Sequence, residues 1–284
     1  MSYLKITNKW RYRLIRLKVI ALKKTDAIVR KAQNTIKKIP IVLVHGAWHK
    51  PSCWNDNFLS YFPDNGHDTY AVRLSEHGKS YTSLKNLRWT SLNDYVNDLS
   101  RVVDSLEEPP VLIGHSLGGA VVQKYLETAN VPGAVLLASA PPHGILNLVF
   151  KLIRTHPIKY LESVLTTDLY HLMEDKQIAK ELLYPDNISE EMLDKYHQKL
   201  QGESFRVLLD LLLFNKTQAK KVKSKILVLG AEKDWIFPPG ELIKTSQAYN
   251  TEATIFPNMA HNMMLEDNWQ DVAHFILDWV KTLQ

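Results

Sequence analysis

One serine in this chain lies in surroundings that suit nucleophilic chemistry. In VLIGHSLGG (residues 111–119) an apolar run leads into Ser116, glycines stand two residues before and two residues after it, and a helical pattern follows. A serine on such a sharp strand-to-helix turn has a strained backbone and an exposed Oγ, and the small glycines let neighbouring elements hold it closely. We therefore predict that Ser116 is a nucleophile, with a structural glycine-rich turn as the alternative.

A serine hydroxyl becomes nucleophilic beside a general base that a third group orients. His261 follows the last predicted strand, in FPNMAHNMMLED, and Asp234 follows the strand before it, in ILVLGAEKDWIFP. The chain order serine, acid, histidine is a known order for this chemistry. We predict that Ser116 attacks, that His261 accepts and returns the proton, and that Asp234 holds the imidazole tautomer. Glu232 is the nearest rival acid, and an ordinary surface role is the alternative for the acid and for the histidine.

The negative charge that develops on a substrate carbonyl oxygen needs hydrogen-bond donors. We expect the backbone N–H of Leu117 to be one donor and that of Ala47, in the loop after the first predicted strand, to be the other. His45 in that loop is expected to shape it by hydrogen bonding rather than to catalyse. Trp48 and Trp54 are expected to line the substrate entrance.

Short apolar segments alternate with helical patterns from residue 39 onward. The predicted strands cover residues 39–45, 69–74, 111–115, 134–138, 226–230 and 253–256. Near-continuous apolar runs are typical of strands buried on both faces. The helical patterns cover residues 92–106, 117–128 and 271–283. The sequence therefore predicts an α/β fold with a mainly parallel sheet flanked by helices.

Residues 141–222 interrupt this alternation. They begin with two prolines and continue through leucine-rich helical patterns with no strand between them. We predict that they form a helical cap (lid) over one end of a core made by residues 39–140 and 223–284. Most of the cap leucines are expected to pack helices together, and the others to favour an acyl chain or an apolar alcohol in the substrate.

Positive charge is concentrated in the first 38 residues. This arm holds twelve Lys or Arg and one acid, a sum of +11, so the remaining residues sum to −6 within the total of +5. Because the body is not basic, we expect no nucleic-acid partner. The apolar residues of the arm lie near helical spacing, which suits contact with an anionic membrane surface. An edge strand or packing helix over residues 12–22 and a targeting peptide are the open alternatives.

Other features bear on the cellular environment and on metal binding. No apolar run reaches the roughly 20 residues that cross a bilayer, and Cys53 has no second cysteine with which to form an internal disulfide. We expect a cytoplasmic protein, with peripheral membrane contact through residues 1–38 as the alternative. His45 and His49 lie four apart but in a loop rather than on one helix face. We therefore expect no metal and no cofactor.

The motifs LVHGAWHKPSCW, GHSLGG, LGAEKDWIFP and MAHNMMLE resemble stretches of α/β-hydrolases, and the resemblance covers residues 39–284. Within that superfamily, HGAWHKPSCW is similar to a loop of the plant methylesterase and hydroxynitrile lyase group and of bacterial relatives described as esterases or lysophospholipases. The resemblance implies a serine hydrolase and favours Asp234 over Glu232 as the acid. Hydroxynitrile lyases of this group have lysine where Asn262 stands and threonine where Gly46 stands, which disfavours cyanohydrin cleavage.

A serine at position 116 also disfavours epoxide hydrolases and haloalkane dehalogenases, which resemble this fold but attack through aspartate. We therefore expect hydrolysis of carboxylic esters of a small or lipid-like substrate through an acyl-enzyme on Ser116. An acyltransferase or thioesterase on the same residues is one alternative, and a lysophospholipase or monoacylglycerol lipase at a membrane surface is another. A non-enzymatic ligand receptor on this fold is the third.

Overall fold

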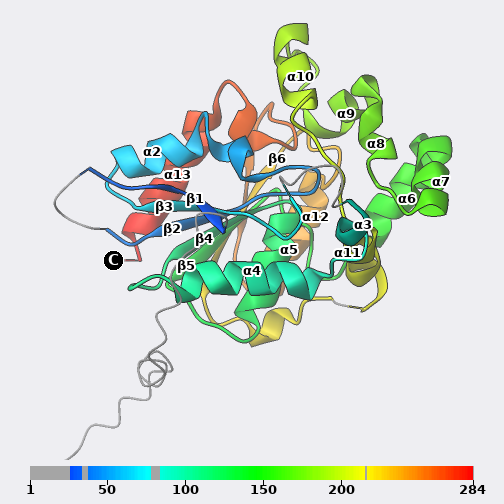
Figure 1. Cartoon of the computed structure of the whole chain (residues 1–284). Coiled ribbons are helices and arrows are strands. Elements are labelled where there is room, and N and C mark those ends of the chain that lie inside the picture. Colours follow the sequence, from blue (N-terminus) through cyan, green and yellow to red (C-terminus); the bar gives the residue numbers. More distant parts are fainter. Residues whose placement is uncertain (1–25, 34–37, 78–83, 215, 284) are drawn as a thin grey trace, which may run out of the picture.

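A computed structural model describes residues 26–33, 38–77, 84–214 and 216–283 of the chain. Seven strands form one central sheet, and helices lie on both of its faces (Figure 1). This layered arrangement confirms the predicted α/β class.

The strands follow one another in the order β1-β3-β2-β4-β5-β6-β7 across the sheet. They are β1 (Ala27–Arg30), β2 (Ile41–Val44), β3 (Thr69–Val72), β4 (Val111–His115), β5 (Gly133–Leu137), β6 (Lys225–Ala231) and β7 (Ala253–Phe256). Neighbours run parallel, except that β1 pairs antiparallel with β3 at the edge. Strands β2 to β7 agree with the predicted runs to within two residues at each end.

Helices cover both faces of the sheet (Figure 1). One face carries α4 (Leu92–Asp104), α5 (Leu117–Leu126) and α12 (Pro239–Ala248), and the other carries α2 (Phe58–Asp64) and α13 (Trp269–Lys281). Three shorter elements, α3 (Leu84–Leu87), η1 (Pro51–Trp54) and η5 (Met263–Leu265), lie in the connections. Helix α4 begins at a capping box, in which Ser91 and Asp94 each accept the other's backbone N–H and so satisfy two donors at the helix end.

Alternating side chains on the strands build two hydrophobic cores. Val42 and Val44 of β2 pack into the core beneath α4 and α5. Ile41 and Leu43, which point the other way, pack into the core beneath α2 and α13. Successive strand residues face opposite sides of a sheet, so a continuous apolar run is needed where both sides are covered.

Between β5 and β6 the described chain contains helices and helical turns only. These are α6 (Leu146–Thr155), α7 (Pro157–Thr166), α8 (His171–Glu174), α9 (Lys176–Leu183), α10 (Glu190–His197), α11 (Phe205–Leu209), η3 (Asp210–Phe214) and η4 (Ala219–Lys221). Helices α6 to α10 lie to one side of the sheet, at the right of Figure 1. We call residues 141–222 the cap segment, and their role as a separate lid stays a prediction.

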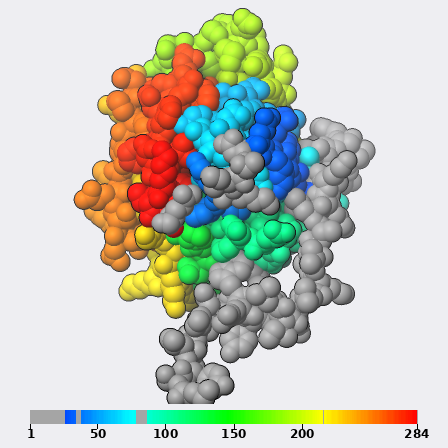
Figure 2. Space-filling view, turned by 90° about the vertical axis from the view of Figure 1, so that its left-hand side faces the viewer, coloured from blue at the N-terminus to red at the C-terminus, as the bar shows by residue number. Residues whose placement is uncertain are grey.

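The described part of the predicted arm belongs to the sheet. Residues Ala27–Arg30 pair with Thr69–Val72, and the exposed side of this edge strand is visible in blue in Figure 2. The boundary at residue 38 is therefore corrected, because residues 27–30 hydrogen-bond to the core. Residues 1–25, which include most of the predicted amphipathic pattern, lie outside the described residues. No helix in the described ranges is long and apolar enough to cross a membrane.

Candidate active site

Ser116 lies on the sharp turn between β4 and α5. Its φ is 53°, in the left-handed region that residues other than glycine rarely adopt. The turn is fixed by the N–H of Ser116, which donates to the carbonyl of Leu137 in β5 at 3.0 Å. A Cβ on Gly114 would lie 2.5 Å from the carbonyl oxygen of Gly118, and one on Gly118 would overlap the carbonyl of Val44. The close approach of α5 to β4 and β2 therefore depends on these glycines.

Asp234 and His261 meet beyond the carboxyl ends of β6 and β7. Nδ1 of His261 lies 2.9 and 3.0 Å from the two carboxylate oxygens of Asp234, and both residues are buried. The same carboxylate accepts the N–H groups of Ile236 (2.8 Å) and Phe237 (2.9 Å). Because a carboxylate only accepts hydrogen bonds, Nδ1 carries the proton and Nε2 is left as the basic nitrogen.

Glu232, the rival acid, does not contact the histidine. Its carboxylate accepts the backbone N–H of Asn258 at 2.8 Å. Of the two acids that the loop offers, Asp234 is therefore the one that orients His261.

His261 lies beside the serine turn. Its ring centroid is 4.9 Å from that of His115, the residue before Ser116, and 5.8 Å from that of Phe237. Nε2 of His115 donates to the carbonyl of His261 at 3.0 Å, and burial lowers the pKa of His115 well below its usual value, so that this ring stays neutral. Within the described residues Ser116 makes no direct hydrogen bond to His261. Such bonds are often long in free enzymes and tighten in the substrate complex.

The two residues predicted to supply the oxyanion donors lie at the same cavity as Ser116. Ala47 and Leu117 both line it, and neither backbone N–H has an acceptor among the described residues. The loop that carries Ala47 packs closely on the serine turn. A Cβ on Gly46 would lie 2.8 Å from Nδ1 of His115 and 2.9 Å from Cβ of Ser116. The threonine that hydroxynitrile lyases have here would therefore require this loop to move.

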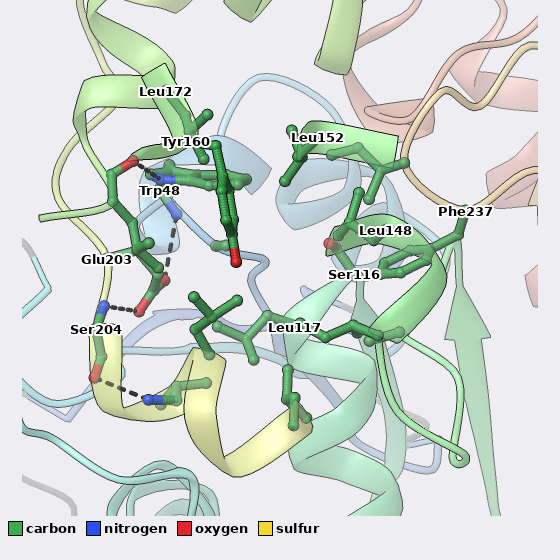
Figure 3. A pocket seen from close by; sticks show the side chains of 18 residues that line it. Trp48, Ser116, Leu117, Leu148, Leu152, Tyr160, Leu172, Glu203, Ser204 and Phe237 are labelled. Atoms are coloured by element: carbon green, nitrogen blue, oxygen red, sulfur yellow. Dashed lines mark hydrogen bonds between the residues drawn. The ribbon is translucent and has the colours of Figure 1, made fainter. Parts of the chain in front are cut away.

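A buried carboxylate from the cap segment anchors this loop. Glu203 accepts four hydrogen bonds: from Trp48 N–H (3.3 Å), Tyr95 Oη (2.8 Å), His77 Nε2 (3.1 Å) and Ser204 N–H (2.7 Å). Figure 3 shows Glu203 between Trp48 and Ser204 on the cavity wall. Trp48 itself has a φ of 59°, and its carbonyl accepts the N–H of Gln201 at 2.9 Å. The cap segment thus holds both the backbone N–H and the carbonyl of Trp48, the strained residue that follows Ala47.

Glu203 and His77 form a buried ion pair. Burial raises the pKa of Glu203, but the charge and hydrogen bonds of its neighbours outweigh burial and hold that pKa below its usual value. Burial lowers the pKa of His77, but the charge of Glu203, the hydrogen bonds to Glu203 and to the Ser75 carbonyl, and the charge of Asp98 together outweigh burial and raise that pKa. We did not single out these residues in the sequence. Their sequence separation of 126 residues leaves no local signal.

An apolar cavity lies over Ser116, between the core and the cap segment (Figure 3). Its cap wall includes Leu148, Leu152, Tyr160, Leu172, Val207 and Leu211. Trp48 lines the cavity, as expected, and its indole N–H donates to the carbonyl of Leu169 at 3.1 Å. The hydroxyl of Tyr160 points into the cavity and has no partner among the described residues.

Trp54 does not line this cavity, so that expectation is wrong. Its side chain is completely buried and packs against Phe58 (centroids 5.5 Å apart) and His115 (6.3 Å) in the core under α2 and α13. The turn η1 directs the indole into the core rather than toward the cap segment.

Glu266 is a second buried acid near the histidine. Its Oε1 accepts the N–H of Ala260, the residue before His261, at 2.5 Å. Burial raises the pKa of Glu266 to about 7, partly opposed by this hydrogen bond. The carboxyl group therefore changes charge near neutral pH beside the loop that carries His261.

The loop histidines mainly shape the backbone around them. Nδ1 of His45 donates a hydrogen bond to the carbonyl of Gly46 at 3.0 Å, and Nδ1 of His49 donates one to the carbonyl of Ala47 at 2.7 Å. Burial lowers the pKa of His49 to about 4. In the described ranges no group of three or more His, Cys, Asp or Glu side chains is placed to hold a metal ion.

Known proteins resemble parts of this chain. It is 33% identical to salicylic acid-binding protein 2 of Nicotiana tabacum over 39% of this chain and 43% of that protein. It is 32% identical to methyl jasmonate esterase 1 of Vitis vinifera over 38% of this chain and 41% of that protein. The chain thus spans less than half the length of these curated relatives.

The fold and a family model extend the comparison to most of the chain. The monoacylglycerol lipase of Paleococcus ferrophilus superposes with a TM-score of 0.64 at 21% identity, over 91% of this chain and 100% of that one, a likeness of fold. The model of the alpha/beta hydrolase family matches residues 41–275, which include the serine turn and the Asp234–His261 pair. This protein is therefore a member of the α/β-hydrolase family.

Proposed function

We propose that this protein is a serine hydrolase that cleaves carboxylic esters of a small or lipid-like substrate. The observation that carries the proposal is the buried pairing of His261 with Asp234 beside the strained Ser116, at the floor of an apolar cavity. The esterase name of one partial relative supports the same class of reaction.

The geometry supports a two-step mechanism. Oγ of Ser116 attacks the ester carbonyl carbon while Nε2 of His261 takes its proton, and Asp234 stabilises the resulting imidazolium. The N–H groups of Ala47 and Leu117 receive the negative carbonyl oxygen. Collapse expels the alcohol, which takes the proton from His261, and leaves an acyl-enzyme on Ser116. Water then attacks with His261 again as base and releases the acid.

The cavity wall favours an apolar substrate. Apart from Ser116, the polar side chains on it are mostly committed: Glu203 accepts four hydrogen bonds, and Oγ of Ser204 donates to the carbonyl of Thr90 at 2.6 Å. Much of the remaining wall is leucine, isoleucine, valine and aromatic carbon. An acyl chain or apolar alcohol therefore suits this wall, because a polar group placed there would find few hydrogen-bond partners.

The test is hydrolysis of p-nitrophenyl esters of graded chain length, beside a lysophospholipid and a monoacylglycerol. We expect Ser116→Ala to reduce turnover by at least about a thousandfold. The exposed Ser60→Ala is the matched control and should leave turnover unchanged. A fluorophosphonate should add its mass to Ser116 in the parent protein and not in Ser116→Ala. Full activity in Ser116→Ala would overturn the proposal.

The same assay separates the other reactions open to these residues. An acyltransferase would give a new ester when a competing alcohol is present, and a thioesterase would prefer a thioester of the same acyl group. Turnover near the uncatalysed rate together with tight ligand binding would instead indicate a receptor.

A further inference from the structure

Helices α6 and α7 carry apolar side chains on their outer surface. Leu146, Phe150 and Ile153 are exposed on α6, at intervals of four and three residues. Ile158, Leu161 and Leu165 are exposed on α7, at intervals of three and four. These spacings place each set on one face of its helix. Ile158 and Leu165 each leave 75% of their surface in contact with solvent, and Phe150 leaves 61%.

These six residues form half of the large hydrophobic side chains that the described structure exposes. Single exposed apolar residues are ordinary, whereas a contiguous group marks an interaction surface. The two helices are consecutive and pack against each other, so their stripes lie on neighbouring elements. We call the six residues the α6–α7 surface.

The opposite faces of the same helices line the cavity above Ser116. Leu148 and Leu152 of α6 and Tyr160 of α7 belong to its wall, and Figure 3 shows them facing the serine. The two helices are thus apolar on the side that faces the cavity and on the side that faces solvent. A ligand held at the α6–α7 surface lies one helix away from the cavity.

Most of the charged side chains on these two helices already have partners. Nζ of Lys151 donates to the carbonyl of Trp235 at 2.7 Å, and Lys159 lies 2.9 Å from Glu162 and 3.9 Å from Glu174. Arg154 is exposed and makes no ion pair within the described residues. Exposed apolar stripes flanked by Lys and Arg are the pattern of helices that lie in the plane of a membrane interface.

We propose that the α6–α7 surface docks the protein on the surface of a lipid bilayer that contains anionic headgroups. The aliphatic and aromatic side chains enter the boundary between headgroups and acyl chains, and the exposed guanidinium of Arg154 contacts the headgroups. Docking presents the cap wall of the cavity to the bilayer. It does not require the ester chemistry proposed above, so each proposal can fail alone.

A second copy of the chain is a less suitable occupant. In a two-fold symmetric contact the same patch meets itself, so the unpaired Arg154 of one copy would be brought toward the same positive charge of the other. Anionic headgroups neutralise this charge instead.

The experiment uses the full-length Ser116→Ala protein, so that no lipid is consumed, and vesicles of phosphatidylcholine with phosphatidylglycerol. Binding is measured by flotation, and the double variant Ile158→Glu/Leu165→Glu is compared with Ile243→Glu. Ile243 is also exposed, at 46%, but lies on α12. We expect the partition coefficient to fall by at least about tenfold in the double variant. The apolar side chains of Ile158 and Leu165 are stabilised when they leave water for the apolar part of the bilayer, and glutamate is not. Ile243→Glu should bind like the parent.

Two further measurements make the result decisive. The same substitutions in the active protein should leave thermal unfolding and the hydrolysis of a soluble short-chain ester unchanged, since neither residue lines the cavity. Equal vesicle binding by the double variant and the parent would overturn the proposal, as would a parent that does not bind vesicles. A parent that is dimeric in light scattering and becomes monomeric in the double variant would identify a second copy as the occupant and would also overturn it.

Discussion

Asp234 decides which nitrogen of His261 carries the proton, because its carboxylate holds Nδ1 at 2.9 and 3.0 Å. Asp234→Asn keeps the size of the side chain but presents an amide N–H toward the ring, which favours the wrong tautomer. We expect kcat on a soluble ester to fall by about 10⁴-fold, the effect of the equivalent change in a serine protease. Steady-state kinetics with thermal unfolding as a check on folding would test this. A loss below tenfold in a folded variant would mean that another group orients His261.

Glu203 acts on the oxyanion loop rather than on the substrate's reacting atoms. In Glu203→Gln two of its four donors face the amide NH2 group, because each carboxylate oxygen accepts two hydrogen bonds, and the charge opposite His77 is lost. We expect the Ala47 donor to shift, so that kcat falls by roughly tenfold to a hundredfold while KM changes little. Tyr95→Phe, which removes one donor and keeps the ion pair, should have a smaller effect on kcat. An increase in KM alone would place Glu203 in substrate binding instead.

Glu266 makes stability depend on pH. The pKa of its carboxyl is about 7 in the folded chain against a usual 4.5, so its favourable contribution exists below pH 4.5 and is lost as pH rises through 7. Glu266→Gln removes this loss and keeps an acceptor for the Ala260 N–H. We therefore expect the variant, relative to the parent, to gain about 2 kcal/mol in unfolding free energy between pH 5 and pH 8. Urea unfolding at pH 5 and pH 8 measures this gain. A difference in unfolding free energy between variant and parent that is the same at both pH values would contradict the prediction.

The sequence pattern reached Ser116, Asp234 and His261 because each lies in the loop that follows a strand, at an edge where the ends of parallel strands meet. It did not reach Glu203, which depends on how the cap segment folds back over the β2 loop. It misplaced Trp54 for a related reason: spacing indicates that a residue is near a loop but not which way a short 3₁₀ turn directs its ring.

Among the elements, α5 and β2 approach each other closely because of a glycine in α5. A Cβ on Gly118 would overlap the Val44 carbonyl and lie 2.6 Å from that of His45, and neither backbone group can give way easily. Gly118→Ala should therefore lower the unfolding free energy by at least about 2 kcal/mol. Gly240→Ala is the matched control, because no atom lies within 4 Å of the added Cβ in α12. That change should stabilise by about 0.5 kcal/mol, and equal effects at the two sites would contradict this packing.

Strands β2 to β6 were predictable because burial on both faces demands a continuous apolar run, and their residues fill both cores, whereas β7 at the sheet edge is only partly buried. Strand β1 was not, because it is only four residues long, two of them are exposed, and it depends on the free edge of β3 for pairing. Its last residue Arg30 and the following Lys31 gave it the charge of the arm rather than the pattern of a strand.

For the whole molecule, β1 determines where the arm can be altered without loss of the fold. Removing residues through 38 would strip the edge strand from β3, whereas residues 1–25 precede it. Those 25 residues hold eight Lys or Arg and no acid, so the rest of the chain sums to −3 within the total of +5. The positive charge and the apolar α6–α7 surface are therefore separate features, and they respond differently to salt.

Replacing these eight Lys and Arg by Gln in the full chain should weaken binding to anionic vesicles at low salt and reduce the preference over neutral vesicles. Each basic residue near an anionic surface contributes about 1 kcal/mol, and this attraction is screened as the Debye length falls to about 3 Å at 1 M salt. The apolar contact of the α6–α7 surface is not screened, so binding that survives high salt should be lost in Ile158→Glu/Leu165→Glu. Flotation across a salt series measures both, with soluble-ester hydrolysis as the control. A Gln variant that keeps full binding to anionic vesicles at low salt would remove the arm from the interaction and leave the α6–α7 surface as the membrane contact.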